Sequence, residues 1–307
     1  MRGEGKGGLD AMIGPGAFRF GRLVIAEIDN SKAVACFGPG IREQEICLLH
    51  EGIPGGDAYM DLLHDRVTVG MHERTGTPVV RFADGEYAFY DGSLKCNGLY
   101  RQAESVSAIR KAIPDHGTDL RYVAQAGLLA PLVFPGNVGP RKRRIPAFWK
   151  WTGDDGAERF LGFLDRNGVL LTRENYVPFY VVYAYLTSPS FAKAVDGKKV
   201  CILNSDIDLP SCGAWFSARS SRPELLPVPI PESYVATRWR AMREEILRVV
   251  PPDVDLCLVG AGVGALQVCA DIARRFSIPA VDAGHALNMM NDRERKSMGP
   301  RLYTVHR

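Results

Sequence analysis

Apolar and polar positions along the chain follow the periods of both helices and strands, and the clearest unit lies near the C-terminal end. Val254–Val259 is an apolar run that predicts a buried strand, and Ile278–Val281 is a second such run. Between them, Ala265–Phe276 has the amphipathic period of a helix. A strand, a helix and a second strand in this order form a βαβ unit, which builds parallel sheets.

The same patterns predict elements upstream of this unit. Helices are expected at Asp57–Arg74, at Ser105–Ile113 with Pro114 as its stop, at Asn175–Leu186, at Ser190–Val195 and from Pro231–Ser233 to about Val250. Strands are expected from Pro78, at Val200–Leu203 and at Leu225–Ile230, while Leu120–Leu132 fits either type. We therefore predict an α/β fold: a Rossmann-like, mostly parallel sheet flanked by helices.

The N-terminal part has a different pattern. Arg22–Ile28, Ala33–Phe37 and Glu43–His50 read as short strands, which would form a small β appendage or an edge of the main sheet. The glycine-rich Met1–Gly16 lacks the apolar region of a signal peptide and is expected to be disordered. The expected division is a leader over 1–20, the appendage over 21–56 and the main domain over 57–307.

Composition narrows the function class. The chain of 307 residues is 46% hydrophobic and 24% charged, with a net charge of +3, which is ordinary for a globular protein and gives little reason to expect nucleic acid. Its seven cysteines have no C-x-x-C spacing, and we expect reduced core residues of a cytoplasmic protein. The longest apolar stretch, Val177–Leu186, is too short to cross a membrane and suits a buried helix.

Two acids separated by one glycine follow the strand that begins at Pro78. We expect this strand to deliver Asp84 and Glu86 to its carboxyl end, where open α/β sheets bind ligands. Carboxylates there can share Mg²⁺ or Mn²⁺, and Gly85 would let the backbone turn sharply and a ligand approach. The alternative is an ordinary Asp-Gly turn. Arg81, inside the same apolar strand, calls for an anionic partner if it is buried.

A glycine turn, Gly260–Gly264, joins the strand and helix of the C-terminal unit. Such a turn presents backbone N–H groups at a helix N-terminus, an arrangement that binds phosphate. Its G-x-G-x-G spacing, followed by Asp282, would also suit a nicotinamide or S-adenosylmethionine site, or a tight turn without a ligand. His285 after the second strand is either a site residue or a hydrogen-bonded structural one, and the histidine spacing indicates no zinc site.

A basic segment rich in proline, glycine and tryptophan spans Phe134–Trp151. It carries Arg141–Arg144, which is either a solvated loop or a contact for a diphosphate or an acidic acceptor. Basic residues beside aromatic ones also suit single-stranded nucleic acid, but one short cluster in a nearly neutral chain makes nucleic acid an unlikely partner.

Three motifs together give a resemblance to a known family. R-F-A-D-G-E (Arg81–Glu86), L-V-G-A-G-V-G (Leu258–Gly264) and I-P-A-V-D-A-G-H (Ile278–His285) resemble the GT-D-type glycosyltransferases, formerly a domain of unknown function. The resemblance covers roughly Asp57–Asn291. The chain departs from the family pattern at Ala83, where a glycine is frequent, and after His285, where an acid is expected.

The resemblance implies a metal-dependent, hexosyltransferase-like enzyme with a Rossmann-like sheet. It implies that Asp84 and Glu86 hold Mn²⁺ or Mg²⁺, and that the turn glycines Gly260, Gly262 and Gly264 face the nucleotide-sugar donor. It further implies that Arg81, Asp282 and His285 serve catalysis.

The expected donor is a UDP-sugar, and the acceptor is a glycan, a glycoprotein or a small molecule. The alternatives are a non-catalytic protein that binds a nucleotide sugar and a Rossmann-type S-adenosylmethionine methyltransferase.

Overall fold

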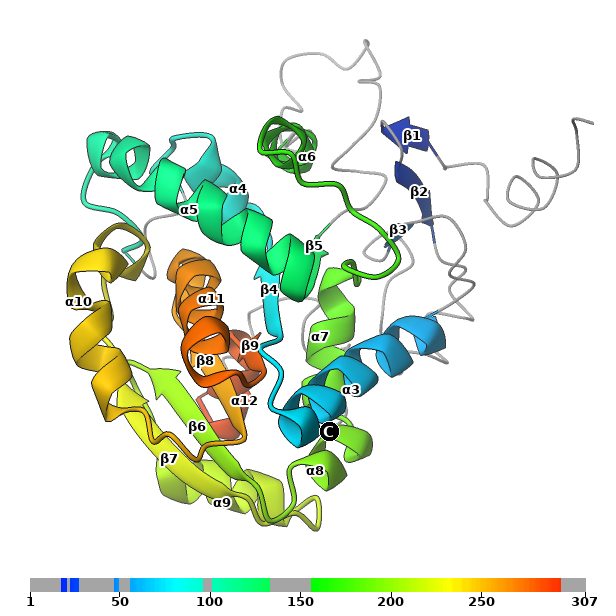
Figure 1. The fold of residues 1–307 in the computed structure, drawn as a ribbon, viewed down its shortest axis with the longest axis vertical. Helices are drawn as coiled ribbons and strands as arrows, with labels where there is room; N and C mark the ends of the chain where they lie inside the picture. The colour runs from blue at the N-terminus through cyan, green and yellow to red at the C-terminus, as the bar shows by residue number, and fades with distance from the viewer. Residues whose placement is uncertain are drawn as a thin grey trace, which may run out of the picture.

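A six-stranded, all-parallel sheet forms the centre of the molecule in the computed structural model, which describes residues 18–20, 23–27, 47–49, 56–95, 101–132 and 156–293 (Figure 1). The strand order is β5-β4-β9-β8-β6-β7. The strands are β4 (Pro78–Phe82), β5 (Leu128–Pro131), β6 (Lys199–Asn204), β7 (Glu224–Pro229), β8 (Leu256–Gly260) and β9 (Ala280–Asp282). The predicted Rossmann-like α/β fold is confirmed.

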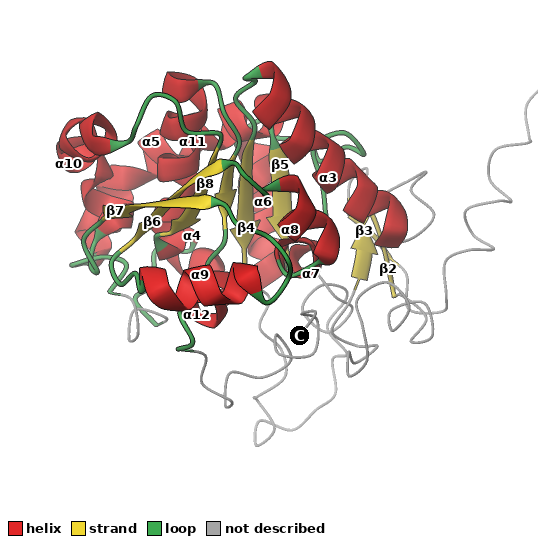
Figure 2. Cartoon of the chain, turned by 90° about the horizontal axis from the view of Figure 1, so that it is seen from below, coloured by secondary structure: helices red, strands yellow, loops and turns green. Residues whose placement is uncertain are grey.

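Helices cover both faces of this sheet (Figure 2). The helices α5 (Val106–Ala126), α10 (Val235–Val249) and α11 (Ala265–Phe276) pack together on one face. The other face carries α7 (Phe179–Leu186), α9 (Leu209–Ser217) and α12 (His285–Met290), with α8 (Pro189–Ala194) after α7 and α3 (Gly56–Glu73) packed on both. The helices α4 (Asp84–Tyr90) and α6 (Gly156–Arg166) contact each other beyond the end of β4.

The strands are buried because helices lie on both sides of them. The side chains of Val79, Leu258 and Val281 are fully buried, which explains why these strands read as continuous apolar runs and not as alternating ones. Cys201, Cys212, Cys257 and Cys269 are free and buried, as predicted for core thiols. The other three cysteines have no described side chain.

The expected stop at Pro114 is wrong, because α5 continues through it to Ala126. A proline leaves the carbonyl four residues earlier without its helical partner. Here that carbonyl belongs to Arg110, an exposed residue, so water can satisfy it. Burial of Ile109 and Leu120 on either side keeps the helix continuous. The ambiguous stretch then resolves into the end of α5 and strand β5, with Gly127 between them.

Two other predicted helices begin later than expected. The helix predicted from Asn175 begins at Phe179, because Tyr176 forms a parallel bridge with Leu129. The N–H of Leu129 donates to Asn175 O at 2.7 Å, and that of Val177 donates to Leu129 O at 3.1 Å. The helix α10 begins at Val235, since Tyr234 has a left-handed backbone with φ of 66°.

The N-terminal strands β1 (Phe18–Phe20), β2 (Leu23–Glu27) and β3 (Cys47–Leu49) form an antiparallel sheet of their own. Of the two arrangements expected, the appendage is therefore confirmed and the main-sheet edge is wrong. The strand β1 lies inside the leader predicted over 1–20. The strand expected at Ala33–Phe37 and the basic segment Phe134–Trp151 lie outside the described residues. No helix in the described ranges is long and apolar enough to cross a membrane.

Candidate functional site

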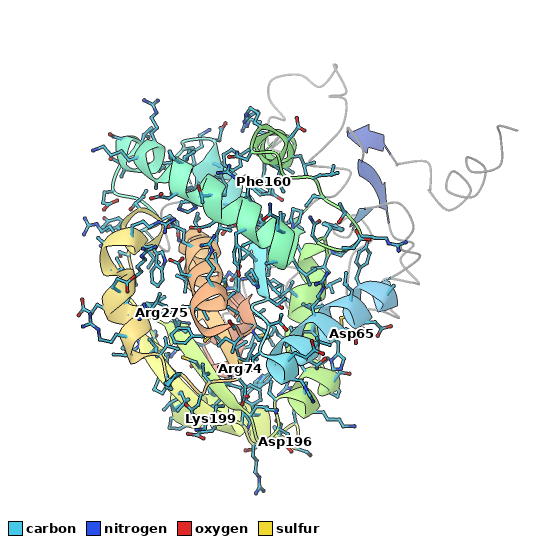
Figure 3. All side chains as sticks on the ribbon, in the orientation of Figure 1. Asp65, Arg74, Phe160, Asp196, Lys199 and Arg275 are labelled. Atoms are coloured by element: carbon cyan, nitrogen blue, oxygen red, sulfur yellow. The ribbon has the colours of Figure 1, made fainter. Side chains whose placement is uncertain are left out.

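The carboxyl ends of four adjacent strands, β4, β9, β8 and β6, bring the predicted motifs to one edge of the sheet. Parallel strands end at the same edge, where α/β proteins bind ligands. Phe160 lies on the opposite side of the molecule from Arg74 and Lys199 (Figure 3). The ring centroid of Phe160 is 4.7 Å from that of Phe82 at the end of β4, whereas Arg74 and Lys199 lie where β4 and β6 begin. The predicted motifs, which are far apart in sequence, therefore meet at the edge of the sheet on which Phe160 lies.

Arg81 and Asp282 join the first and last motifs directly. They lie on neighbouring strands β4 and β9, 201 residues apart, and both side chains are buried. The guanidinium donates from Nη2 to Asp282 Oδ1 at 2.7 Å and from Nε to Asp282 O at 2.8 Å. The backbone N–H of Arg81 donates to Asp282 Oδ2 at 3.2 Å. The anionic partner predicted for a buried Arg81 is therefore Asp282.

The guanidinium of Arg81 is enclosed on its remaining sides. Its central carbon lies 4.4 Å from the ring centroid of Tyr183 and 5.3 Å from that of Phe179, both on α7. At Gly284, where φ is 42°, an added Cβ would lie 1.9 Å from Arg81 Nη2. The glycine of the D-x-G-H segment therefore makes room for the arginine. Both oxygens of Asp282 accept hydrogen bonds from Arg81, so this pair positions the edge of the sheet and leaves no free carboxylate for taking up a substrate proton.

The acid pair lies in the first turn of a helix that begins just beyond the carboxyl end of β4. The strand β4 ends at Phe82, and α4 begins at Asp84, so both acids occupy its first turn. Glu86 folds back to accept the N–H of Ala83 at Oε2, at 2.8 Å. Gly85 is helical, and a Cβ added there would meet nothing within 4 Å. The sharp turn expected at Gly85 is therefore wrong, although the open space above it is compatible with an approaching ligand.

Glu86 is the perturbed carboxyl of this edge. Burial raises its pKa to about 7, the nearby Asp282 raises it further, and the Ala83 N–H and Arg81 oppose the shift. The backbone N–H of Glu86 itself also opposes the shift. Burial also raises the pKa of Asp282, against the opposing effect of Arg81. A cation or a hydrogen-bond donor near Oε1 would stabilise the ionised form of Glu86.

These residues supply only part of a metal site. Side chains two apart on a helix leave it in different directions, so Asp84 and Glu86 do not form a ready chelate. No cluster of three or more His, Cys, Asp or Glu side chains that could hold a metal occurs in the described ranges. Oxygen ligands nevertheless suit Mg²⁺, which commonly binds one or two carboxylates together with substrate phosphates and water. The chemistry of this donor set fits such a cation.

The glycine turn is occupied by a side chain from another segment. Gln102, buried before α5, accepts the N–H of Val263 at Oε1, at 2.9 Å. At Gly262, where φ is 54°, an added Cβ would lie 2.6 Å from Gln102 Nε2. The side-chain oxygen of Gln102 therefore accepts from the Val263 N–H, a donor that was expected to bind a phosphate of a ligand. This contact favours the tight turn without a bound phosphate at Val263.

The two flanking glycines also allow close packing. A Cβ at Gly260 would lie 2.8 Å from Asn204 Nδ2, and one at Gly264 would lie 2.6 Å from Val235 Cγ1. Packing therefore accounts for glycine at these positions without a nucleotide.

His285 begins the short helix α12 and is partly buried. Its Nδ1 lies 3.2 Å from Asn288 Nδ2, a contact in which the amide donates. This hydrogen bond matches the structural alternative for His285 and assigns its ring an orientation at the edge of the sheet.

Two residues of this edge were not predicted. Gln102 lies in an irregular stretch where no sequence pattern marks it. Asn204 carries a usable signal, because it is the first polar residue after the apolar run Val200–Leu203, as Asp84 is after β4.

No family model matches this sequence, and neither a curated protein nor a solved structure matches it significantly.

Proposed function

We propose that this chain is a metal-dependent glycosyltransferase that moves a sugar from a nucleoside diphosphate sugar to an acceptor. The observation that supports it most is the Arg81–Asp282 pair, because it brings the two motifs that resemble the GT-D family, R-F-A-D-G-E and V-D-A-G-H, into one site. That site lies at the carboxyl edge of a parallel sheet, where such folds bind nucleotides.

The reaction develops negative charge on the leaving diphosphate. Asp84 and Glu86 would hold a Mg²⁺ or Mn²⁺ ion, which would supply positive charge to the leaving diphosphate. Arg81 and Asp282 keep the ends of β4 and β9 together and so position α4 against the segment that follows β9. Asp282 is fully engaged, so the candidates for contact with the acceptor hydroxyl are Glu86 and His285.

A donor panel tests this proposal. Release of free nucleotide from UDP-sugars, GDP-sugars and other sugar nucleotides is measured with Mn²⁺ and with EDTA, with a mixture of simple sugars as acceptors. We expect turnover of one donor that EDTA abolishes. Asp84→Asn should lower that turnover by about two orders of magnitude, because a metal ligand at a developing charge contributes several kcal/mol.

The matched control is Asp61→Asn, which makes the same chemical change at an exposed position on α3. It should leave turnover unchanged. Full turnover in Asp84→Asn would overturn the metal role. Donor binding without turnover in any acceptor mixture would identify a non-catalytic nucleotide-sugar protein. Binding of S-adenosylmethionine in place of every nucleotide sugar would identify a methyltransferase.

A further inference from the structure

Asn204 ends β6 at the same edge of the sheet, and its side chain has a fixed orientation. Its Oδ1 accepts the backbone N–H of Asp206 at 3.3 Å and the hydroxyl of Ser205 at 3.4 Å. A backbone N–H can only donate, so the oxygen of the carboxamide must face the Ser205–Asp206 turn. The amide nitrogen is therefore turned the other way, toward Gly260 on β8.

The amide nitrogen of Asn204 has no acceptor among the described residues, and it is open at the edge of the sheet because it is not one of the fully buried atoms that lack a partner. The residue as a whole is 9% exposed. An oriented amide that is open at the carboxyl edge of a parallel sheet can donate to an oxygen of a bound molecule.

We propose that Asn204 is a specificity-determining residue that donates from Nδ2 to a hydroxyl oxygen of a sugar. The inference rests on the proposed function for the class of ligand. Three inter-strand spacings of about 4.8 Å separate β4 from β6, so Asn204 lies about 14 Å along the edge from the acids of α4. A diphosphate near Asp84 and a sugar near Asn204 thus fit on one edge.

The surroundings of Asn204 favour a neutral hydroxyl over a phosphate. Ser205 and Asp206 follow it and are exposed, and Asp208 lies two residues further along. Asp206 is paired with Arg293, and Asp208 caps α9 by accepting the N–H of Ser211. Carboxylates beside the amide would repel a phosphate dianion but can accept hydrogen bonds from sugar hydroxyls.

The test compares Asn204→Asp with wild type on two kinds of probe. The aspartate keeps an oxygen for Asp206 and Ser205 and replaces the donor by a second, negatively charged oxygen. Free glucose, galactose, mannose and N-acetylglucosamine are examined by saturation-transfer NMR, and the donor panel is repeated with monodeoxy analogues of any donor that turns over. Ser205→Ala is the matched control, since it changes the neighbouring side chain and leaves Nδ2 in place.

We expect Asn204→Asp to lose the NMR signal of the bound sugar and to raise KM at least tenfold, with kcat changed less. For wild type, one deoxy analogue should have a KM as high as the parent donor has with the variant. The variant should show the same KM for that analogue and for the parent donor. A merely structural role would lower turnover of every analogue alike. Equal sugar binding or equal KM in the variant and wild type would overturn the inference.

The outcomes separate this inference from the proposed function. Turnover that is unaffected in Asn204→Asp rejects the role of Asn204 and leaves the transferase in place. A sugar bound through Asn204 without turnover or binding of any nucleotide sugar rejects the transferase and supports a sugar site. Absence of binding to every sugar and nucleotide sugar rejects both.

Discussion

His116 makes the stability of this protein depend on pH in a defined direction. The side chain is fully buried in α5. Its Nε2 lies 2.7 Å from the carbonyl of Ala236, which can only accept, so Nε2 carries the proton. Its Nδ1 then accepts the hydroxyl of Tyr90 at 3.0 Å. The neutral ring thereby links α5 to α10 and α4, and a second proton would have no acceptor in the place where Tyr90 donates.

Burial lowers the pKa of His116 from the ordinary value of 6.5 to about 4. Between these values the unfolded chain binds a proton that the folded chain does not, so the free energy of unfolding falls as pH falls. The full stabilisation is present above pH 6.5. Linkage between the two pKa values gives a loss of about 2 kcal/mol from about pH 7.5 to pH 5.

Urea unfolding of wild type and of His116→Gln at both pH values measures this contribution. Glutamine keeps a donor for Ala236 and an acceptor for Tyr90 but does not titrate. The variant should be less stable at pH 7.5 and should lose about 2 kcal/mol less than wild type on acidification. Other titrating groups, Glu86 included, are present in both proteins, so their contributions to the pH dependence cancel in the comparison. Parallel losses in the two proteins would refute the reasoning that burial penalises a charged His116.

Three further predictions concern the edge of the sheet. Gly284→Ala should destabilise the protein by about 1–3 kcal/mol, since its Cβ would collide with Arg81 and strain a left-handed backbone, whereas Gly85→Ala in open space should be neutral or slightly stabilising; urea unfolding of both compares them directly. Arg81→Met should lower the free energy of unfolding by about 3–5 kcal/mol, because Asp282 would be left buried and unpaired. Adding Asp282→Leu should raise the melting temperature part of the way back, and no recovery in the double variant would contradict this prediction. Gln102→Ala should cost about 1–3 kcal/mol by unpairing a loop amide, without creating phosphate binding detectable by calorimetry.

The elements of the main domain could be read from the sequence where local patterns determine them. The helix predicted at Ala265–Phe276 is α11 to the residue, because an amphipathic period and a glycine turn are properties of neighbouring residues. The strands predicted at Val254–Val259 and Ile278–Val281 are β8 and β9 with bounds shifted by one or two residues, because their apolar runs mark strands that helices bury on both faces. The boundaries failed where distant packing competes with local preference. Pro114 stays inside α5 because buried residues on both sides hold the helix, and Tyr176 stays out of α7 because its segment bonds to Leu129.

The site was predictable as a set of residues but not as a set of contacts. The motifs at Arg81–Glu86 and Asp282–His285 stand out by composition, and the end of a parallel strand is where chemistry is expected. Only the tertiary structure pairs Arg81 with Asp282, because hydrogen bonds between strands β4 and β9 depend on strand order. Strand order likewise brings Asn204 beside Gly260, and the fold alone leads Gln102 into the glycine turn. Sequence patterns report local periodicity and chemistry, whereas which donor meets which acceptor is decided by how the sheet is assembled.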